Sequence, residues 1–210
     1  MYWVFIRHGE SEYSREGRYT GTTDIALTAE GHRQAAAVGV WLARYWFPTR
    51  ILCSPKLRTR QTLEGLRDGG KLHAMPALYD ERLREIYYGA WESMTREEIL
   101  ASDPDTYVQW EARPTHLRAG ITGETATDVR TRVRALLESE PYDPRGITWF
   151  VTHRTVMRIL MADLLEMPLD QYRSHFEQGH ASVNIFKVRF DPAQRIAAHL
   201  IHANLQPWQS

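Results

Sequence analysis

Two adjacent cationic side chains, Arg7 and His8, follow the first apolar run of the sequence and precede Gly9. An imidazole with a guanidinium beside it can bind an anion, and a glycine lets the backbone turn so that both side chains point at it. The same residues would also occur at an exposed strand end without a function. The pair therefore indicates an anion site only if residues of matching chemistry come to the same place in the fold.

Two further cations, Arg58 and His153, also follow apolar runs. Arg58 lies in the first turn of a helix predicted after the run 50–53, and His153 comes directly after the run 147–152. In an open α/β sheet, the carboxyl ends of parallel strands and the N-termini of the next helices meet at one edge, where anions bind. We therefore expect Arg58 and His153 to lie near the first pair, although a solvated helix charge is the alternative for Arg58.

A candidate proton donor lies in the segment 81–92, which is charged at first and then aromatic. The segment contains three glutamates, Glu81, Glu85 and Glu92. Burial against aromatic side chains raises the pKa of a carboxyl group, which can then hold a proton and donate it. The residue types alone do not decide which of the three would do so.

The elements that must position these residues follow from hydrophobic periodicity and capping residues. Apolar runs predict strands at 2–6, 50–53, 71–75, 147–152, 183–190 and 196–202, the last two as a hairpin. Helices are predicted to start after Thr28, at Ser54 and Pro55, after Thr125 and at about Thr155. The segment 89–122 has a different residue pattern, with a capping box and two prolines. It is therefore predicted to be a helical insertion rather than part of the sheet.

Composition limits the class of protein. The chain has 210 residues, of which 43% are apolar and 25% charged, as expected for one globular domain over 1–210. Lysine plus arginine equals aspartate plus glutamate, 26 of each, so no overall field favours nucleic acid or an anionic membrane as a partner. The single cysteine, Cys53, excludes an internal disulfide, and the first residues do not resemble a signal peptide. These features predict a cytoplasmic protein.

Four motifs, in order, resemble those of the histidine phosphatase superfamily, which contains cofactor-dependent phosphoglycerate mutases and several kinds of phosphatase. The motifs are Arg7-His8-Gly9-Glu10-Ser11, Ser54-Pro55-x-x-Arg58-x-x-Gln61-Thr62, Leu83-Arg84-Glu85-Ile86 with Gly89, and Val151-Thr152-His153. The likeness covers the whole length of the chain. It implies a three-layer α/β/α fold with a mostly parallel, doubly wound sheet, in which the insertion 89–122 forms a lid.

The resemblance also implies a role for each site residue. His8 would be the nucleophile that forms a phosphohistidine, and Arg7, Arg58 and His153 would hold the phosphoryl oxygens. Glu85 would protonate the leaving oxygen and later deprotonate the attacking water. The implied substrate is a small phosphorylated molecule, and no metal or other cofactor is needed because the arginines supply positive charge.

Two residues depart from the family pattern. Ser14 stands where the family usually has asparagine, and we expect it to contact the substrate together with Thr20 and Gly21 of the long polar loop 11–27. Arg154 replaces the glycine that commonly follows the second histidine. It would either contact an acidic part of the substrate or point to solvent, and the sequence slightly favours solvent.

Two other functions remain to be weighed against a phosphatase. Mutases of the family carry a pair of adjacent arginines in the insertion, whereas Arg96, Arg113 and Arg118 are scattered here. A protein that only binds a phosphorylated ligand has no need of an acid at Glu85. Both points favour a phosphatase. The sequence leaves a homo-oligomer open.

Overall fold

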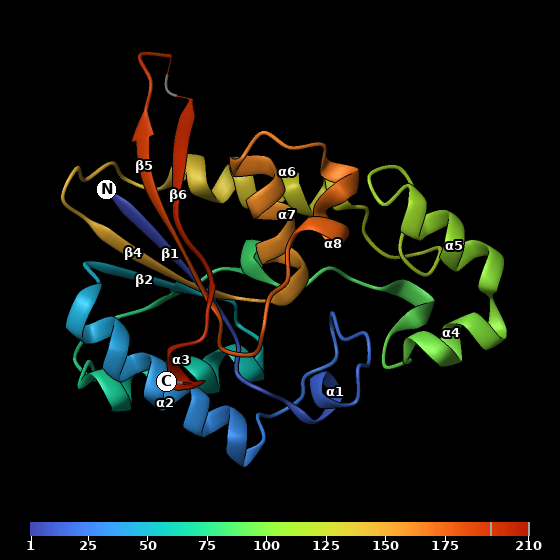
Figure 1. Cartoon of the computed structure of the whole chain (residues 1–210), viewed down its shortest axis with the longest axis horizontal. Helices are drawn as coiled ribbons and strands as arrows, with labels where there is room; N and C mark the ends of the chain where they lie inside the picture. Colours follow the sequence, from blue (N-terminus) through green and yellow to red (C-terminus); the bar gives the residue numbers. More distant parts are fainter. Residues whose placement is uncertain (194, 210) are drawn as a thin grey trace.

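A mixed six-stranded sheet forms the centre of the protein in the computed structural model, which describes residues 1–193 and 195–209. The strands are β1 (Tyr2–Arg7), β2 (Arg50–Cys53), β3 (Leu78–Tyr79), β4 (Ile147–Thr152), β5 (Val183–Phe190) and β6 (Ile196–Leu205). They are arranged in the order β3-β2-β4-β1-β5-β6 (Figure 1). The first four in this order are parallel, and β5 is antiparallel to both of its neighbours. The predicted α/β fold with a mostly parallel sheet is confirmed.

Helices cover both faces of the sheet, which gives the three predicted layers. Helices α2 (Ala29–Tyr45) and α3 (Leu57–Gly70) lie on one face, and α6 (Ala126–Ser139) and α7 (Arg154–Leu164) lie on the other (Figure 1). Side chains alternate between the faces along a strand. In β1, Trp3 and Phe5 accordingly join the core with α6 and α7, while Val4 and Ile6 join the core with α2 and α3.

The strand predicted at 71–75 is wrong, and β3 lies after Pro76 instead. Lys71 adopts the left-handed conformation with φ of 56°, and the N–H of Leu72 donates to the carbonyl of Arg67 at 2.8 Å. This is a helix C-terminal capping arrangement. Leu72 is buried because it packs beneath the end of α3, so its apolar character reflects a cap rather than a strand.

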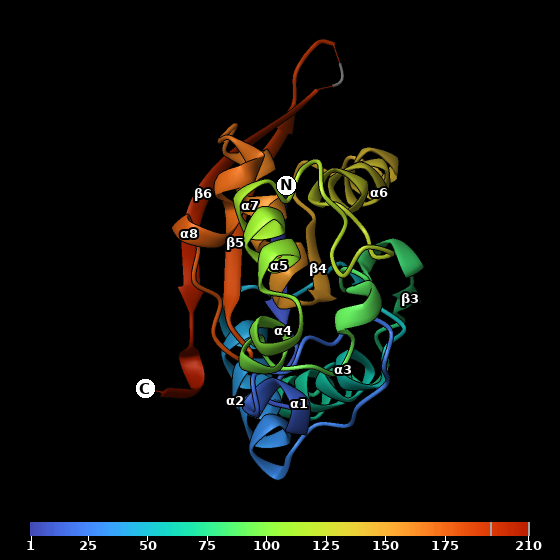
Figure 2. The same ribbon diagram turned by 90° about the vertical axis from the view of Figure 1, so that its right-hand side faces the viewer.

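Two short helices, α4 (Arg96–Ser102) and α5 (Pro104–Ala112), lie in the segment 89–122. They stand beside the main body at the right of Figure 1 and in front of it in Figure 2. Tyr107 and Trp110 of α5 are buried, and the Trp110 ring lies 5.2 Å from that of Trp91. Aromatic packing therefore joins this segment to the same core as α6 and α7.

The remaining helical segments are short: α1 (Glu12–Arg15), α8 (Tyr172–His175) and 3-10 turns at Glu81–Leu83, Gly89–Trp91, Leu169–Gln171 and Pro207–Gln209. No helix in the described part of the chain combines the length and the apolar character that a membrane span requires.

Strand register brings the predicted site residues to one edge of the sheet. Arg7, the last residue of β1, lies opposite Thr152 of β4, and Cys53 of β2 lies opposite Val151. The three strands are parallel, so the residues that follow them in the chain leave the sheet on the same side. His8, Ser54 and His153 therefore come together although they are far apart in sequence.

Candidate active site

A cleft of about 570 Å³ opens at the carboxyl edge of the central strands. Arg7, His8, Arg58 and Glu85 line it. The described residues that line the cleft do not include His153, but its ring lies 5.3 Å from the ring of His8. The structure thus brings together the five residues that the sequence singled out.

Hydrogen bonding fixes the protonation of the His8 ring. Its Nδ1 lies 2.7 Å from the carbonyl oxygen of Gly9, which can only accept, so Nδ1 carries the proton. The lone pair is then on Nε2. Burial, together with the Arg7 and Arg58 cations, lowers the pKa of His8 well below its usual range. His8 is consequently a neutral imidazole with an unprotonated Nε2, as a nucleophile must be.

Gly9 is required by close packing rather than by a turn. A Cβ on Gly9 would lie 2.4 Å from the carbonyl oxygen of Gly31 in α2. The N–H of Gly9 donates to the hydroxyl of Thr62 in α3 at 3.0 Å. The segment after His8 is therefore held against both helices of one layer, and the expected role of Gly9 in turning the chain is replaced by this contact.

Arg58 is held by the polar loop that follows β1. Its Nη1 donates to the carbonyl of Thr23 at 3.0 Å, and Nη2 donates to those of Thr20 and Gly21 at 2.9 and 3.3 Å. The side chain is 2% exposed. The alternative of a solvated helix charge is therefore wrong, and the loop positions the guanidinium at the base of the cleft.

The three candidate glutamates have different environments. Glu81 is exposed. Glu92 accepts hydrogen bonds from the backbone N–H groups of Gly21 and Thr22, and so supports the loop that holds Arg58. Glu85 alone of the three lines the cleft. Tertiary structure thus makes the choice that the residue types left open.

Glu85 lies against the first turn of α7. Its carboxylate accepts from the N–H groups of Thr155 at 3.0 Å, Val156 at 3.3 Å and Ile86 at 2.9 Å. Burial raises the pKa of Glu85, although the backbone donors act in the opposite direction. The N–H groups at the start of α7 are therefore bonded to Glu85.

His153 is clamped between Arg58 and Ser54. The Nε of Arg58 donates to Nδ1 of His153 at 3.2 Å, so Nε2 carries the ring proton and donates to the hydroxyl of Ser54 at 2.8 Å. Burial and the cation of Arg58 lower the pKa of His153 well below its usual range. The neutral ring therefore holds the guanidinium of Arg58 at its Nε, while the loop holds the same guanidinium at its Nη groups.

Ser54 does not cap a helix as the sequence suggested. Helix α3 begins at Leu57, three residues later, and its N-cap residue Lys56 has no side-chain capping bond. The carboxylate of Asp24 instead accepts from the N–H of Leu57 at 2.6 Å. The Ser54 hydroxyl accepts from the N–H of Lys56 at 3.5 Å and from His153 at 2.8 Å, and no local pattern in the sequence indicated the bond to His153.

Two of the three residues that were predicted to contact the substrate lie at the cleft. Ser14 and Thr20 line the cleft, whereas Gly21 is not among the described lining residues. The hydroxyl of Ser14 donates to the carbonyl of Ser11 at 2.9 Å and accepts from its N–H at 2.8 Å. Ser14 therefore closes the turn after the Arg-His pair, and Gly21 contributes its backbone to the support of Arg58.

Comparison with known proteins identifies the family. Residues 3–198 match the model of the histidine phosphatase superfamily, branch 1. The chain belongs to this superfamily. The resemblance read from the four motifs is confirmed, and the protein is a phosphatase of the superfamily.

The chain aligns over most of its length with relatives and with solved structures. Phosphoserine phosphatase 1 of Hydrogenobacter thermophilus is 30% identical over 187 residues, covering 87% of this chain and 84% of the relative. Glucosyl-3-phosphoglycerate phosphatase of Mycobacterium tuberculosis is 30% identical over 188 residues, covering 85% and 82%. The structure of a mycobacterial glucosyl-3-phosphoglycerate phosphatase in complex with VO3 superposes with a TM-score of 0.82 at 27% identity, covering 97% of this chain and 98% of that one.

Proposed function

We propose that this phosphatase hydrolyses small phosphomonoesters through a phosphohistidine on His8, without a metal ion. The observation that carries the proposal is the bond from His8 Nδ1 to the carbonyl of Gly9, which leaves the Nε2 lone pair available beside two arginines at the base of a cleft. The names of the relatives, phosphoserine phosphatase and glucosyl-3-phosphoglycerate phosphatase, support a phosphorylated small molecule as the substrate.

In the first step, Nε2 of His8 forms a bond to phosphorus while the ester P–O bond breaks. Glu85 gives its proton to the leaving oxygen, and the raised pKa of this buried carboxyl supports that role. Arg7 and Arg58 stabilise the charge on the phosphoryl oxygens. His153 acts on this phosphate through Arg58, because its Nδ1 accepts from Nε of Arg58 and holds the guanidinium in place.

In the second step, water attacks phosphorus and passes a proton to the Glu85 carboxylate as the P–N bond breaks. His8 returns to its neutral form with a free lone pair, and Glu85 is again protonated. Positive charge around the phosphoryl group comes from the guanidinium groups throughout, so the mechanism requires no metal ion.

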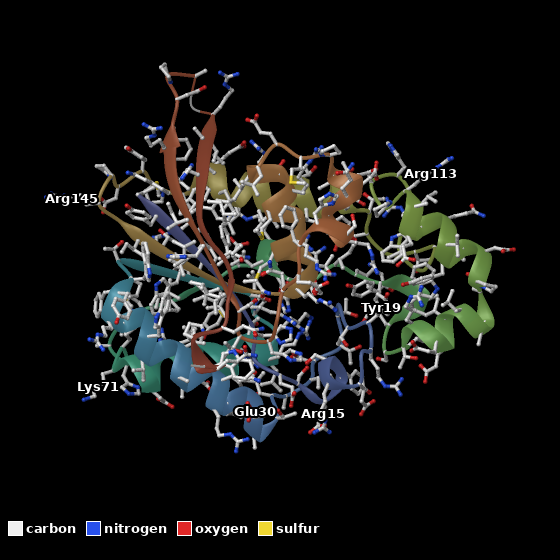
Figure 3. The ribbon with its side chains drawn as sticks, viewed as in Figure 1. Arg15, Tyr19, Glu30, Lys71, Arg113 and Arg145 are labelled. Carbon is white, nitrogen blue, oxygen red and sulfur yellow. The ribbon has the colours of Figure 1, made fainter. Side chains whose placement is uncertain are left out.

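Helices α4 and α5 form the proposed lid. Arg96 of α4 and Glu111 of α5 line the cleft. Tyr19, from the loop after β1, lies between this loop and the two helices (Figure 3), and its hydroxyl is 2.7 Å from that of Tyr107. These contacts support a lid role because they connect the segment 89–122 directly to the loop that holds Arg58.

Trapping of the intermediate tests the proposal. Quenching the reaction with alkali during turnover of a ³²P-labelled ester should leave label on the protein as an acid-labile, alkali-stable phosphoramidate. His8→Ala should lose both the label and hydrolysis of p-nitrophenyl phosphate, and EDTA should leave the wild-type rate unchanged. Full activity of His8→Ala, or loss of activity in EDTA, would contradict the mechanism. Isomerisation of phosphoglycerate without phosphate release would support a mutase instead.

A further inference from the structure

The wall of the cleft beside Glu85 carries two arginines that the proposed phosphoryl transfer does not use. Arg154 and Arg158 lie one turn apart on α7, and both line the cleft. Each has a guanidinium nitrogen close to the same carboxylate oxygen of Glu177, at 3.4 Å for Arg154 and 3.1 Å for Arg158. Arg154 therefore lines the cleft and pairs with Glu177, while its side chain is still 45% exposed to solvent.

Arg158 is a buried cation with incomplete pairing. Its side chain is 8% exposed, and its Nε has no hydrogen-bond partner among the described residues. The Glu177 side chain, by contrast, is 76% exposed. Burying a guanidinium is costly unless its donors are satisfied. A well-solvated carboxylate gives poor compensation, and a second anion in the cleft would give better compensation.

The position of this pair relative to the reacting bond follows from Glu85. The carboxylate of Glu85 binds the N–H groups of Thr155 and Val156, which lie between Arg154 and Arg158 on α7. A leaving oxygen that takes its proton from Glu85 must start at this turn of the helix. From this turn, the rest of the leaving group can reach the wall that carries the two arginines.

Glu177 indicates the chemistry that this wall accepts. One carboxylate oxygen is already within ion-pair distance of both guanidinium groups. Guanidinium groups bind carboxylates well because their planar donors match the two oxygens. The cleft also carries excess positive charge, since seven arginines and four carboxyl side chains line it among the residues that the structure describes. A substrate with a phosphate and one further negative charge would compensate this excess positive charge.

We propose that Arg154 and Arg158 form a second anion subsite, which selects phosphomonoesters whose leaving group carries a carboxylate. The subsite rests on the proposed function, because the phosphate must be placed at His8 for the leaving group to reach α7. Glu177 occupies the subsite until the carboxylate of the substrate displaces it.

Two phosphomonoesters that differ in one group test the subsite. 3-Phosphoglycerate has a carboxylate where glycerol 3-phosphate has a hydroxymethyl group. The wild type should show a kcat/KM at least about tenfold higher for 3-phosphoglycerate, a difference typical of one specific charged contact. Arg154→Gln should lower this ratio about tenfold, mainly by raising KM for 3-phosphoglycerate. Glu177→Gln should raise the ratio because the competing carboxylate is removed.

Arg145→Gln is the matched control, since Arg145 is exposed and far from the cleft (Figure 3) and the same charge is lost. It should keep the wild-type ratio. Arg158→Gln should act like Arg154→Gln, and its folding is checked by circular dichroism. If Arg158→Gln does not fold, Arg154→Gln still tests the subsite, because Arg154 is half-exposed. A ratio that is unchanged in both Arg154→Gln and Glu177→Gln would overturn the subsite.

Calorimetric binding separates the subsite from the catalytic proposal, because binding requires no turnover. Tighter binding of 3-phosphoglycerate than of glycerol 3-phosphate, lost in Arg154→Gln, supports the subsite even if neither compound is hydrolysed, and only the proposed hydrolysis would then fail. Hydrolysis of p-nitrophenyl phosphate through a labelled His8, with equal binding of the two probes, would support the proposed function and overturn the subsite.

Discussion

The Nε2 of His153 lies 2.8 Å from the hydroxyl oxygen of Ser54, although the two residues are 99 positions apart in the chain. Both are completely buried. The Nε–H of Arg58 donates to Nδ1 of His153, so Nε2 carries the ring proton and donates to the Ser54 hydroxyl. A serine outside the reacting groups thereby fixes the orientation of a guanidinium that is expected to bind phosphate.

Ser54→Ala should reduce kcat about tenfold, because the His153 ring loses its partner and Arg58 is held less firmly. A buried donor left without an acceptor costs about 1–3 kcal/mol, so the free energy of unfolding should fall as well. The ¹⁵N NMR spectrum should still show the Nε2-protonated form of His153, because Arg58 donates to Nδ1, but the Nε2 signal should shift because its hydrogen bond to Ser54 is lost. Ser139→Ala serves as the control, because Ser139 is exposed on α6 and its hydroxyl donates only within that helix, to the carbonyl of Leu136 at 2.7 Å. An unchanged Nε2 signal together with the wild-type kcat in Ser54→Ala would contradict the positioning role.

Glu85→Gln should slow hydrolysis of alkyl phosphates by about 10²–10⁴-fold, the usual contribution of a general acid. The loss should be much smaller for the first step with p-nitrophenyl phosphate, because p-nitrophenolate leaves without needing a proton. Rates of phosphoenzyme formation measured by rapid quench distinguish the two substrates. Glu81→Gln, an exposed change in the same segment, should behave as the wild type. Equal losses for the two leaving groups would exclude Glu85 as the proton donor.

The pH profile should follow two opposite requirements. His8 attacks only when neutral, so the rate falls as pH drops through the pKa of His8, which burial and the neighbouring arginines place well below 6.5. Glu85 donates only when protonated, so the rate falls as pH rises through the pKa of Glu85, which burial places above 4.5. The acid limb of kcat/KM for an alkyl phosphate should therefore lie well below pH 6.5. Glu85→Gln should abolish the alkaline limb, and its persistence in that variant would assign the limb to another group.

Gly9→Ala should destabilise the protein and impair catalysis together. The added Cβ would lie 2.4 Å from the carbonyl oxygen of Gly31, and one of the two segments must move. Overpacking of this kind costs about 1–3 kcal/mol, which thermal unfolding can measure. Gly31→Ala meets the carbonyl oxygen of Glu10 at 2.1 Å and should have a similar effect from the other side of the same contact. Wild-type melting temperatures in both variants would show that this contact does not hold the segment after His8.

Much of the architecture is local and could be predicted from the sequence. Apolar runs of four to six residues form β1, β2 and β4. Thr28 caps the N-terminus of α2, and Thr125 caps the N-terminus of α6. Parallel strands share one carboxyl edge, so the arginine and histidine side chains that follow these strands are expected to meet. The run 71–75 predicts a strand but forms a helix cap, because a cap with one buried leucine has the same short apolar pattern as a strand.

The sequence by itself determined which residue types reach the edge of the sheet, since strand and helix periodicity act over a few neighbouring residues. Only the tertiary structure decided what each side chain meets there. It placed Glu85 rather than Glu92 in the cleft, brought Ser54 within hydrogen-bond distance of His153, and placed Arg154 beside Arg158 in the lining of the cleft. These outcomes depend on contacts between segments tens of residues apart, because protonation and orientation are set by hydrogen-bond partners that no local spacing specifies.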